Sequence, residues 1–320
     1  MSHVRSTARG PMAVLCLLMV LGSCDDPTAG TNPGEAAVAD ARGGPFGQKT
    51  EDGGRNVVRY YGIPVRVGNG LARTYVLVDR ASREHPLEIG VALSEKALDG
   101  LPAAPATAAM AMSGHHTQNM QLLELPEQNP TPYEFVELDW NPAGHEPAGV
   151  YDLPHFDFHF YTVPVATRNA ILPTDPDFAA KAANLPLEDF RPPFYLDGAT
   201  AAGAPAAAVT VPQMGLHWVD VRSPELQGLE GNPAGFQPFT KTFLIGSWDG
   251  RFIFDEPMIT RAYLLAKEGS TDAAVQDEII PVPTARRYAP AGFYPSAYRV
   301  AYDAHAHEFL VALTLLVQRD

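Results

Sequence analysis

Hydrophobic and polar positions alternate most regularly in residues 154–161, which read PHFDFHFY. Successive side chains of a β-strand point to opposite faces of its sheet. Three phenyl rings would share one face: Phe156, Phe158 and Phe160. The other face would carry three titratable residues and a tyrosine: His155, Asp157, His159 and Tyr161. We therefore expect the phenyl face to lie in the core and the polar face to line a second, sheltered space.

Similar patterns predict about ten strands along the chain, in addition to a few short helices. The expected strands are residues 56–67, 71–79, 86–94, 133–140, 154–161, 214–221, 239–250, 251–257, 296–303 and 308–317. Short helices are expected at 94–99, 175–186 and 260–269. Asn69-Gly70 is expected to supply the positive φ of a tight turn. Residues 101–112 and 197–212 are expected to be loops, the second ending in a strand.

The composition favours a β-rich fold over a helical one. The chain has 30 prolines and 27 glycines, which suit turns and loops better than long helices. No internal repeat is visible, which argues against a solenoid or propeller. The sequence therefore predicts a mainly β fold, with a single β-sandwich or distorted barrel domain over residues 55–320, long loops and a few short helices.

The amino-terminal segment has the pattern of a signal peptide. Two arginines precede a short apolar run at residues 12–21, which is too short for a permanent membrane-spanning helix. The run ends in LGSC, which resembles a bacterial lipobox. This resemblance implies removal of residues 1–23 and attachment of lipid to Cys24. We therefore expect a lipoprotein that is anchored to a membrane and lies outside the cytoplasm, in the cell envelope.

Residues 24–54 would connect this anchor to the domain, because they are small, polar and rich in glycine and proline. The predicted lipoprotein leader also accounts for both cysteines of the chain. Cys16 would be lost with the leader and Cys24 would carry lipid, so neither a disulfide within the chain nor a thiolate metal site is expected.

The net charge of −14 bears on the partners of the protein. The 23 lysines and arginines do not gather into a basic cluster. Binding to the phosphate backbone needs such a cluster, so we expect no nucleic-acid partner. Contact with a membrane would run through the lipid anchor rather than through the folded surface.

The polar face of residues 154–161 suggests a metal site. Imidazole and carboxylate together suit Zn²⁺, which we favour, and also Mn, Fe or Ni. Neighbouring same-face residues lie about 6.6 Å apart on a strand, so His155 and His159 would be about 13 Å apart. Either Asp157 joins one histidine on the metal while the other supports it, or Pro154 marks a distortion that brings His155 inward.

Other segments offer further ligands for a site built on His155, Asp157 and His159. His217 lies in a strand, with Trp218 on the opposite face. His145 and Glu146 precede residues 154–161 by a loop, and Glu256 would end the strand 251–257. We assign His217 to the metal set and the other three to supporting roles. The alternatives are a buried hydrogen-bonded network without metal, or a polar patch on the surface.

Several segments resemble a group of exported bacterial proteins and lipoproteins that share a domain of unknown function. They are GHEPAGVYDLPHFDFHFY, MGLHWVD, PFTKTFLIGSWDGRFIFDEPMIT and the terminal YRVAYD hairpin. The resemblance covers roughly residues 130–320. The resemblance implies a β-rich extracytoplasmic domain, compatible with a homo-oligomer, and it implies no activity.

Two functions remain open from the sequence. The first is a binding or assembly module of the cell envelope that holds a metal without catalysis, with an unknown ligand. The alternative is a metal-dependent hydrolase or hydratase that uses a metal-bound water.

Overall fold

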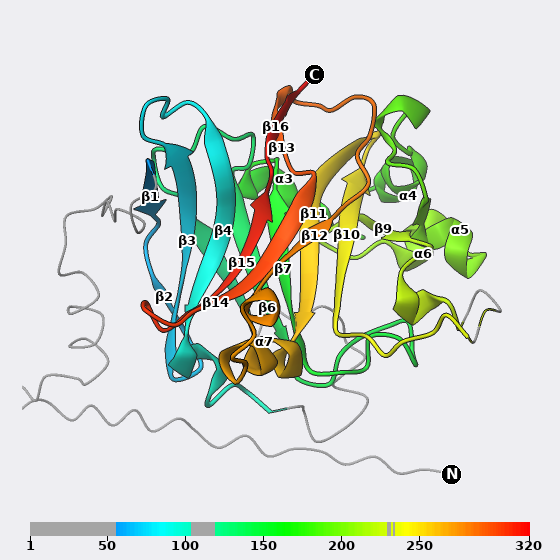
Figure 1. Ribbon diagram of the computed structural model, residues 1–320. Coiled ribbons are helices and arrows are strands. Elements are labelled where there is room, and N and C mark those ends of the chain that lie inside the picture. The colour runs from blue at the N-terminus through cyan, green and yellow to red at the C-terminus, as the bar shows by residue number, and fades with distance from the viewer. Residues whose placement is uncertain (1–55, 104–118, 229–231, 233) are drawn as a thin grey trace, which may run out of the picture. The chain divides into compact units, whose positions relative to one another are not determined.

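Antiparallel β-sheets are the main regular structure of the protein, as Figure 1 shows. The structure is a computed structural model that describes residues 56–103, 119–228, 232 and 234–320. The expected leader, the expected lipidation site Cys24 and the expected tether lie outside these residues, as does most of the loop expected at 101–112. The described residues contain sixteen strands, more than the sequence predicts, because several are short or lie at sheet edges. All of them fall within one compact unit.

The first sheet has the strand order β1-β3-β4-β15-β14-β12, with β2 paired to β3. Its strands are β1 (Val57–Tyr61), β2 (Val65–Val67), β3 (Gly70–Asp79), β4 (Pro86–Ser94), β12 (Asp277–Pro281), β14 (Ala297–Asp303) and β15 (Glu308–Thr314). Strand β15 is buried along its whole length. In the β2–β3 turn the positive φ is at Gly68, at +52°, rather than at Asn69-Gly70 as the sequence predicts.

The second sheet has the order β5-β6-β7-β11-β10-β9-β8. Its strands are β5 (Met120–Glu124), β6 (Phe135–Asn141), β7 (His155–Tyr161), β8 (Tyr195–Asp197), β9 (Leu216–Asp220), β10 (Lys241–Trp248) and β11 (Arg251–Thr260). A small third sheet pairs β13 (Gly292–Tyr294) with β16 (Val317–Arg319). Strand β11 continues past the end predicted at residue 257, so Glu256 lies inside the strand.

The helices are short. They are η1 (Glu95–Leu98), α3 (Val165–Asn169), α4 (Phe178–Ala183), η2 (Glu188–Phe190), α5 (Gly198–Ala202), α6 (Ala206–Val209), η3 (Pro224–Leu226), α7 (Arg261–Glu268) and α8 (Ala273–Gln276). The loop predicted at 197–212 is wrong, since α5 and α6 occupy it. The Asp197 carboxylate starts α5 by accepting from the Thr200 backbone N–H at 2.9 Å. Within the described residues, no helix is long and apolar enough to cross a membrane.

The two large sheets pack face to face, which confirms a β-sandwich; the described strands form no closed barrel. Val76, Val91 and Val311 of the first sheet join the phenyl rings of β7 in one cluster of buried residues. Phe156, Phe158 and Phe160 are all fully buried there. Burying a phenylalanine side chain contributes about 1.5–3 kcal/mol, so this cluster is a principal source of stability.

The outer face of the second sheet is also covered. Near one end, Phe135 and Phe254 pack with Ile171 and Phe178, which follow or begin the short helices α3 and α4. Near the other end is a second cluster: Val150, Tyr151, Leu226, Phe239, Leu244 and Met258. Polar residues of β6, β7 and β11 lie on this same face. The fold therefore shelters the polar side of β7 as well as its phenyl side.

Candidate metal centre

Three adjacent strands bring polar side chains together on the outer face of the second sheet. In the register of β6 and β7, Glu137 is opposite His159, Asp139 opposite Asp157, and Asn141 opposite His155. All six side chains are buried. Strand β11 lies on the other side of β7 and adds Glu256. Antiparallel pairing between segments far apart in the sequence thus concentrates the titratable groups of the site.

The first potential ligand group contains His145, His155 and Asp157. The Nε2 atom of His155 lies 3.1 Å from Oδ1 of Asp157, and Nε2 of His145 lies 3.4 Å from Oδ2. His145 comes from the loop between β6 and β7, which folds back over the strand that follows it. The amide of Asn141 donates to Oδ2 of Asp157 at 2.6 Å and fixes the orientation of the carboxylate.

Backbone carbonyls orient both histidines of this group. The Nδ1 atom of His155 lies 2.6 Å from the Leu153 carbonyl oxygen, and Nδ1 of His145 lies 2.7 Å from that of Glu146. A carbonyl oxygen only accepts, so each Nδ1 must carry the proton. In the neutral ring the lone pair is then on Nε2, directed at Asp157. Metal-bound histidines have this arrangement, in which the remote N–H donates to a backbone carbonyl or carboxylate.

The second group contains His159, His217 and Glu256. Nε2 of His159 lies 3.3 Å from Oε1 of Glu256, and Nε2 of His217 lies 3.5 Å from Oε2. His217 reaches the group from β9, while Trp218 faces the core, as the sequence predicts. The side chain of His217 is 18% exposed, against 2% for Glu256, so this group lies nearer to solvent on the His217 side.

A third group shares His159 with the second and adds Glu137 and Asp139. Nδ1 of His159 lies 3.3 Å from Oδ2 of Asp139, so the imidazole stands between two carboxylates. The buried guanidinium of Arg168 in α3 forms an ion pair with Glu137. Asp139 could therefore orient His159 from behind while Glu256 and His217 complete a ligand set, an arrangement common in carboxylate–histidine–metal sites.

Burial and mutual repulsion oppose ionisation of the carboxyl groups. Burial, with a further contribution from Asp157, raises the pKa of Asp139 to about 8. Burial and the neighbouring Asp139 raise the pKa of Glu137 to about 7, although His159 and Arg168 act in the opposite direction. Burial likewise raises the pKa of Glu256, with Asp157 and Asp139 adding to the effect. The site therefore contains more buried carboxyl groups than its positively charged side chains can neutralise.

The histidines respond to the same environment. Burial would raise the pKa of Asp157, but His155 and His145 outweigh it and hold that pKa below its usual range. Burial lowers the pKa of His159, which favours the neutral, metal-binding form. Burial also acts against protonation of His145, but Asp157 outweighs it and raises the pKa of that ring.

Several ligand atoms of this face make no hydrogen bond with any residue that the structure describes. They are Nε2 of His155, both ring nitrogens of His159, both carboxylate oxygens of Asp139, Oδ1 of Asp157 and Oε2 of Glu256. Leaving a buried donor or acceptor unsatisfied costs about 1–3 kcal/mol, and more when it is charged. These atoms belong to the three ligand groups and lie close to one another, which indicates that a cation fits among them.

Gly246 leaves room for an aromatic ring that packs over the histidines of the second group. A Cβ atom at Gly246 would lie 2.0 Å from Cζ of Phe254, so only glycine leaves room for that ring. The Phe254 ring centroid is 4.9 Å from that of His159 and 5.3 Å from that of His217. The ring therefore packs against both histidines and limits their freedom to turn.

The structure brings together most of the residues that the sequence singles out, but in two groups rather than one. Strand β7 is regular through this region, so His155 and His159 remain apart and Asp157 lies with His155. His145 and Glu256, assigned supporting roles from the sequence, lie within ligand range. Glu146 does not: its side chain is exposed, and it contributes its carbonyl oxygen to His145.

Sequence reasoning missed Glu137, Asp139, Asn141 and Arg168. A signal for the first three was present. Residues 135–141 read FVELDWN, in which the polar residues occupy alternate positions as they do in β7. Arg168 had no such signal, because its place beside Glu137 depends on how α3 packs over the sheet.

Comparison with known proteins identifies a similarity in one part of the chain. Residues 82–140 match the family model TTHB210-like, described as hypothetical protein TTHB210. This description names no activity. The matched range includes Glu137 and Asp139 but none of the histidines of the site, and it overlaps the 130–320 resemblance only at its end. The comparisons with curated proteins and with solved structures found no match.

Proposed function

We propose that this protein binds two divalent cations on the outer face of its second sheet. His145, His155 and Asp157 would hold the first cation. His159, His217 and Glu256 would hold the second, with Asp139 orienting His159. Each set has two imidazoles and one carboxylate, a combination that suits Zn²⁺ and also Mn, Fe or Ni. We favour Zn²⁺ because the donors are borderline nitrogen and oxygen atoms rather than oxygen alone.

One observation carries this proposal: buried imidazole and carboxylate atoms lie close together without forming hydrogen bonds with one another. His155 and Asp157 come within 3.1 Å, and His159 and Glu256 within 3.3 Å, yet these contacts do not have hydrogen-bond geometry. Buried carboxylates and imidazoles are tolerated when they are paired, hydrogen-bonded or bound to a metal. A network without metal would need further protonation to complete its hydrogen bonds.

The enclosure of the site favours binding over turnover. Two cavities border the second sheet, and none of the six proposed ligands lines either of them. Five of the six ligands are at most 10% exposed in their side chains, and only His217 is more open. A substrate would therefore have little access. We infer a metal-binding module that retains or is stabilised by its ions.

One observation favours the second candidate, a metal-dependent hydrolase or hydratase. Each set supplies three protein ligands, and a tetrahedral ion would keep one position for water. In the second set that position could open beside His217. Assays with ester, phosphate and hydration substrates would separate the candidates: turnover that a chelator abolishes supports an enzyme, and metal binding without turnover supports the module.

The cellular location is a separate proposal that depends on the sequence alone. The apolar leader and the LGSC motif support lipid attachment at Cys24 and a location in the cell envelope. Replacing Cys24 by serine removes the lipidated thiol. The Cys24→Ser protein should move from the membrane fraction to the soluble fraction, and unchanged membrane association would contradict lipid anchoring.

Metal stoichiometry tests the main proposal. Chelator-treated protein titrated with Zn²⁺ in a calorimeter should bind two equivalents per chain. His155→Ala and His217→Ala should each bind one, because each variant breaks a different set. His305→Ala is the matched control, since that histidine lies in the exposed turn between β14 and β15, and it should still bind two. Less than one equivalent in the unmodified protein would refute the proposal.

A further inference from the structure

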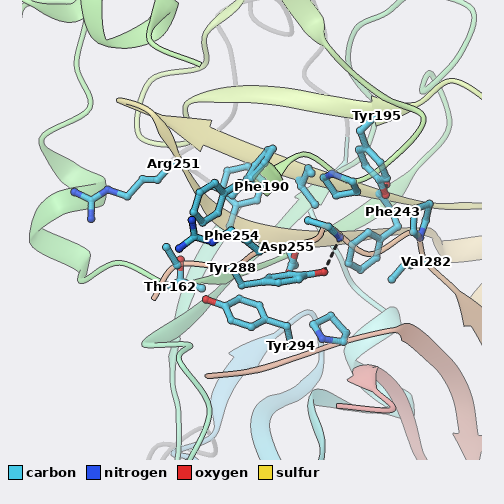
Figure 2. Close-up of a pocket in the computed structure, with 18 of the residues that line it drawn as sticks. Thr162, Phe190, Tyr195, Phe243, Arg251, Phe254, Asp255, Val282, Tyr288 and Tyr294 are labelled. Carbon is cyan, nitrogen blue, oxygen red and sulfur yellow. Dashed lines mark hydrogen bonds between the residues drawn. The ribbon is translucent and has the colours of Figure 1, made fainter. Parts of the chain in front are cut away.

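Strand β11 carries a second carboxylate that faces away from the metal-binding groups. Asp255 precedes Glu256 and points to the opposite face of the sheet, where it lines a cavity of about 100 Å³ (Figure 2). Residues with aromatic side chains supply much of the remaining lining: Phe190, Tyr195, Phe243, Tyr288 and Tyr294. A single carboxylate thus opens into a largely aromatic space between the sheet and residues 282–295.

Within the described residues, the Asp255 carboxylate accepts one side-chain hydrogen bond, which the Tyr133 hydroxyl donates to Oδ2. No lysine, arginine or histidine nitrogen of the described residues forms an ion pair with it. Two arginines border the cavity, but neither neutralises the carboxylate. Figure 2 shows the Arg251 side chain directed away from the cavity. Arg287 lies with its guanidinium carbon 5.2 Å from the centre of the Phe190 ring, and its side chain is exposed.

Two tyrosines beside Asp255 are held in place by the segment that carries them. The Tyr288 hydroxyl accepts from the Ala285 backbone N–H at 3.0 Å, the dashed line in Figure 2. The Tyr294 hydroxyl donates to the Pro290 carbonyl at 2.6 Å. Their ring centroids are 4.4 Å apart. With both hydroxyls engaged, the tyrosines present ring surface to the cavity.

We propose that this cavity binds a small organic ammonium cation, with Asp255 as its counter-ion and the tyrosine rings as its wall. Aromatic faces attract cations, and enclosed aromatic sites are a common means of binding quaternary ammonium groups. A neutral apolar ligand would bury the carboxylate without compensation. An anion would be repelled by it. This proposal does not depend on metal binding.

The cavity size limits the ligand. An apolar cavity of about 150 Å³ accommodates benzene, so 100 Å³ suits a compact head group rather than a whole drug-sized molecule. A trimethylammonium group has this scale. A longer ligand would place its head group at Asp255 and leave its remainder outside the cavity.

Matched probes test the charge requirement. Choline and its neutral isostere 3,3-dimethylbutan-1-ol have the same shape and differ in charge. In calorimetry with the full chain, choline should bind at least about tenfold more tightly than the isostere, since a desolvated cation–aromatic contact favours binding by roughly 30-fold. Equal affinities, or no binding of choline at millimolar concentration, would overturn the proposal.

Variants test the residues. Asp255→Asn keeps the shape and removes the charge, and it should abolish the preference for choline. Tyr294→Leu should weaken choline binding without affecting the isostere equally. The metal-site variant His155→Ala should bind choline as the unmodified protein does. A choline preference that survives Asp255→Asn, in a variant that unfolds at the same temperature as the unmodified protein, would contradict the role of Asp255.

Discussion

Asp157 and Phe158 are consecutive residues, both almost completely buried, that lie on opposite faces of the same sheet: Phe158 is 0% exposed in the sandwich core and Asp157 is 1% exposed among the titratable groups. Burial on both sides of a strand usually produces a continuous hydrophobic run. Here the second face is polar. Alternate residues of β7 therefore serve different purposes: those on the phenyl face stabilise the core, and those on the polar face are the proposed ligands.

This division predicts different effects for the two neighbours. Phe158→Ala should lower the free energy of unfolding by about 3–5 kcal/mol, because it leaves a cavity in the core, while the folded fraction keeps both metal equivalents. Asp157→Asn should lose one equivalent. Urea denaturation and metal analysis of the two purified variants measure both properties. Loss of metal from folded Phe158→Ala, with full retention by Asp157→Asn, would contradict the assignment.

Asn141 should influence the first set without binding the ion itself. Its amide holds Asp157 at 2.6 Å, and loss of such an outer partner typically lowers metal affinity by about 10- to 100-fold. We expect Asn141→Ala to weaken the first site by this factor and leave the second unchanged. Asn184→Ala is the control, because that exposed amide contacts Asp249 instead. Equal affinities for Asn141→Ala and the unmodified protein would rule out the positioning role.

Gly246 should be intolerant of any side chain. A methyl group there would collide with the Phe254 ring, and such overpacking typically destabilises a protein by about 1–3 kcal/mol. Gly246→Ala should therefore unfold at lower urea concentration and bind the second metal more weakly. Gly269→Ala is the matched control, since its new Cβ would meet nothing closer than 3.8 Å. Equal stability of both variants would show that Phe254 can move freely.

Much of the fold was predictable from the sequence because alternation reports directly on sheet faces. The phenyl face of β7 lies in the core as predicted, and His217 and Trp218 occupy opposite faces. The terminal hairpin also forms as expected. The Asp303 carboxylate supports its turn by accepting from the His305 and Ala306 backbone N–H groups.

The ends of strands and their pairing partners were harder to predict from the sequence. The sequence pattern predicted that the strand beginning at residue 251 ends at Pro257, a residue that cannot donate a hydrogen bond to a sheet. In the structure β11 passes through it, paired with β7 at Asp255–Phe160 and again at Met258–Asp157, with Pro257 between these pairs. Which strand lies beside β7 depends on contacts between segments nearly a hundred residues apart, and no local pattern contains that information.

For the same reason, the sequence could not separate the two ligand groups. The spacing of His155 and His159 indicated that they do not share an ion on a regular strand, but it left their partners open. His145 joins His155 through the return of a loop, and Glu256 joins His159 through the neighbouring strand. Both contacts are tertiary.

Stability of the metal-free protein should depend on pH through Asp139. Its pKa is raised by burial to about 8, above the ordinary value of 3.8. The protonated form is thus favoured in the folded state, so its contribution to stability is present below pH 4 and is lost as the pH rises towards 8. Asn resembles the protonated carboxyl. Relative to the unmodified protein, Asp139→Asn should therefore gain stability between pH 4 and pH 8.

Urea denaturation of both chelator-treated proteins across this range measures the effect. A stability difference that does not change with pH would mean that Asp139 titrates normally in the folded state. Added Zn²⁺ should reduce the pH dependence of the unmodified protein, because the cation compensates the buried negative charge.

Anomalous diffraction from a crystal grown with Zn²⁺ tests the central claim most directly. Two peaks per chain are expected on the outer face of the second sheet. One should lie about 2.0–2.1 Å from Nε2 of His155, and the other at the same distance from Nε2 of His159. A map without peaks at either position, with water or hydrogen bonds on those nitrogens instead, would contradict it.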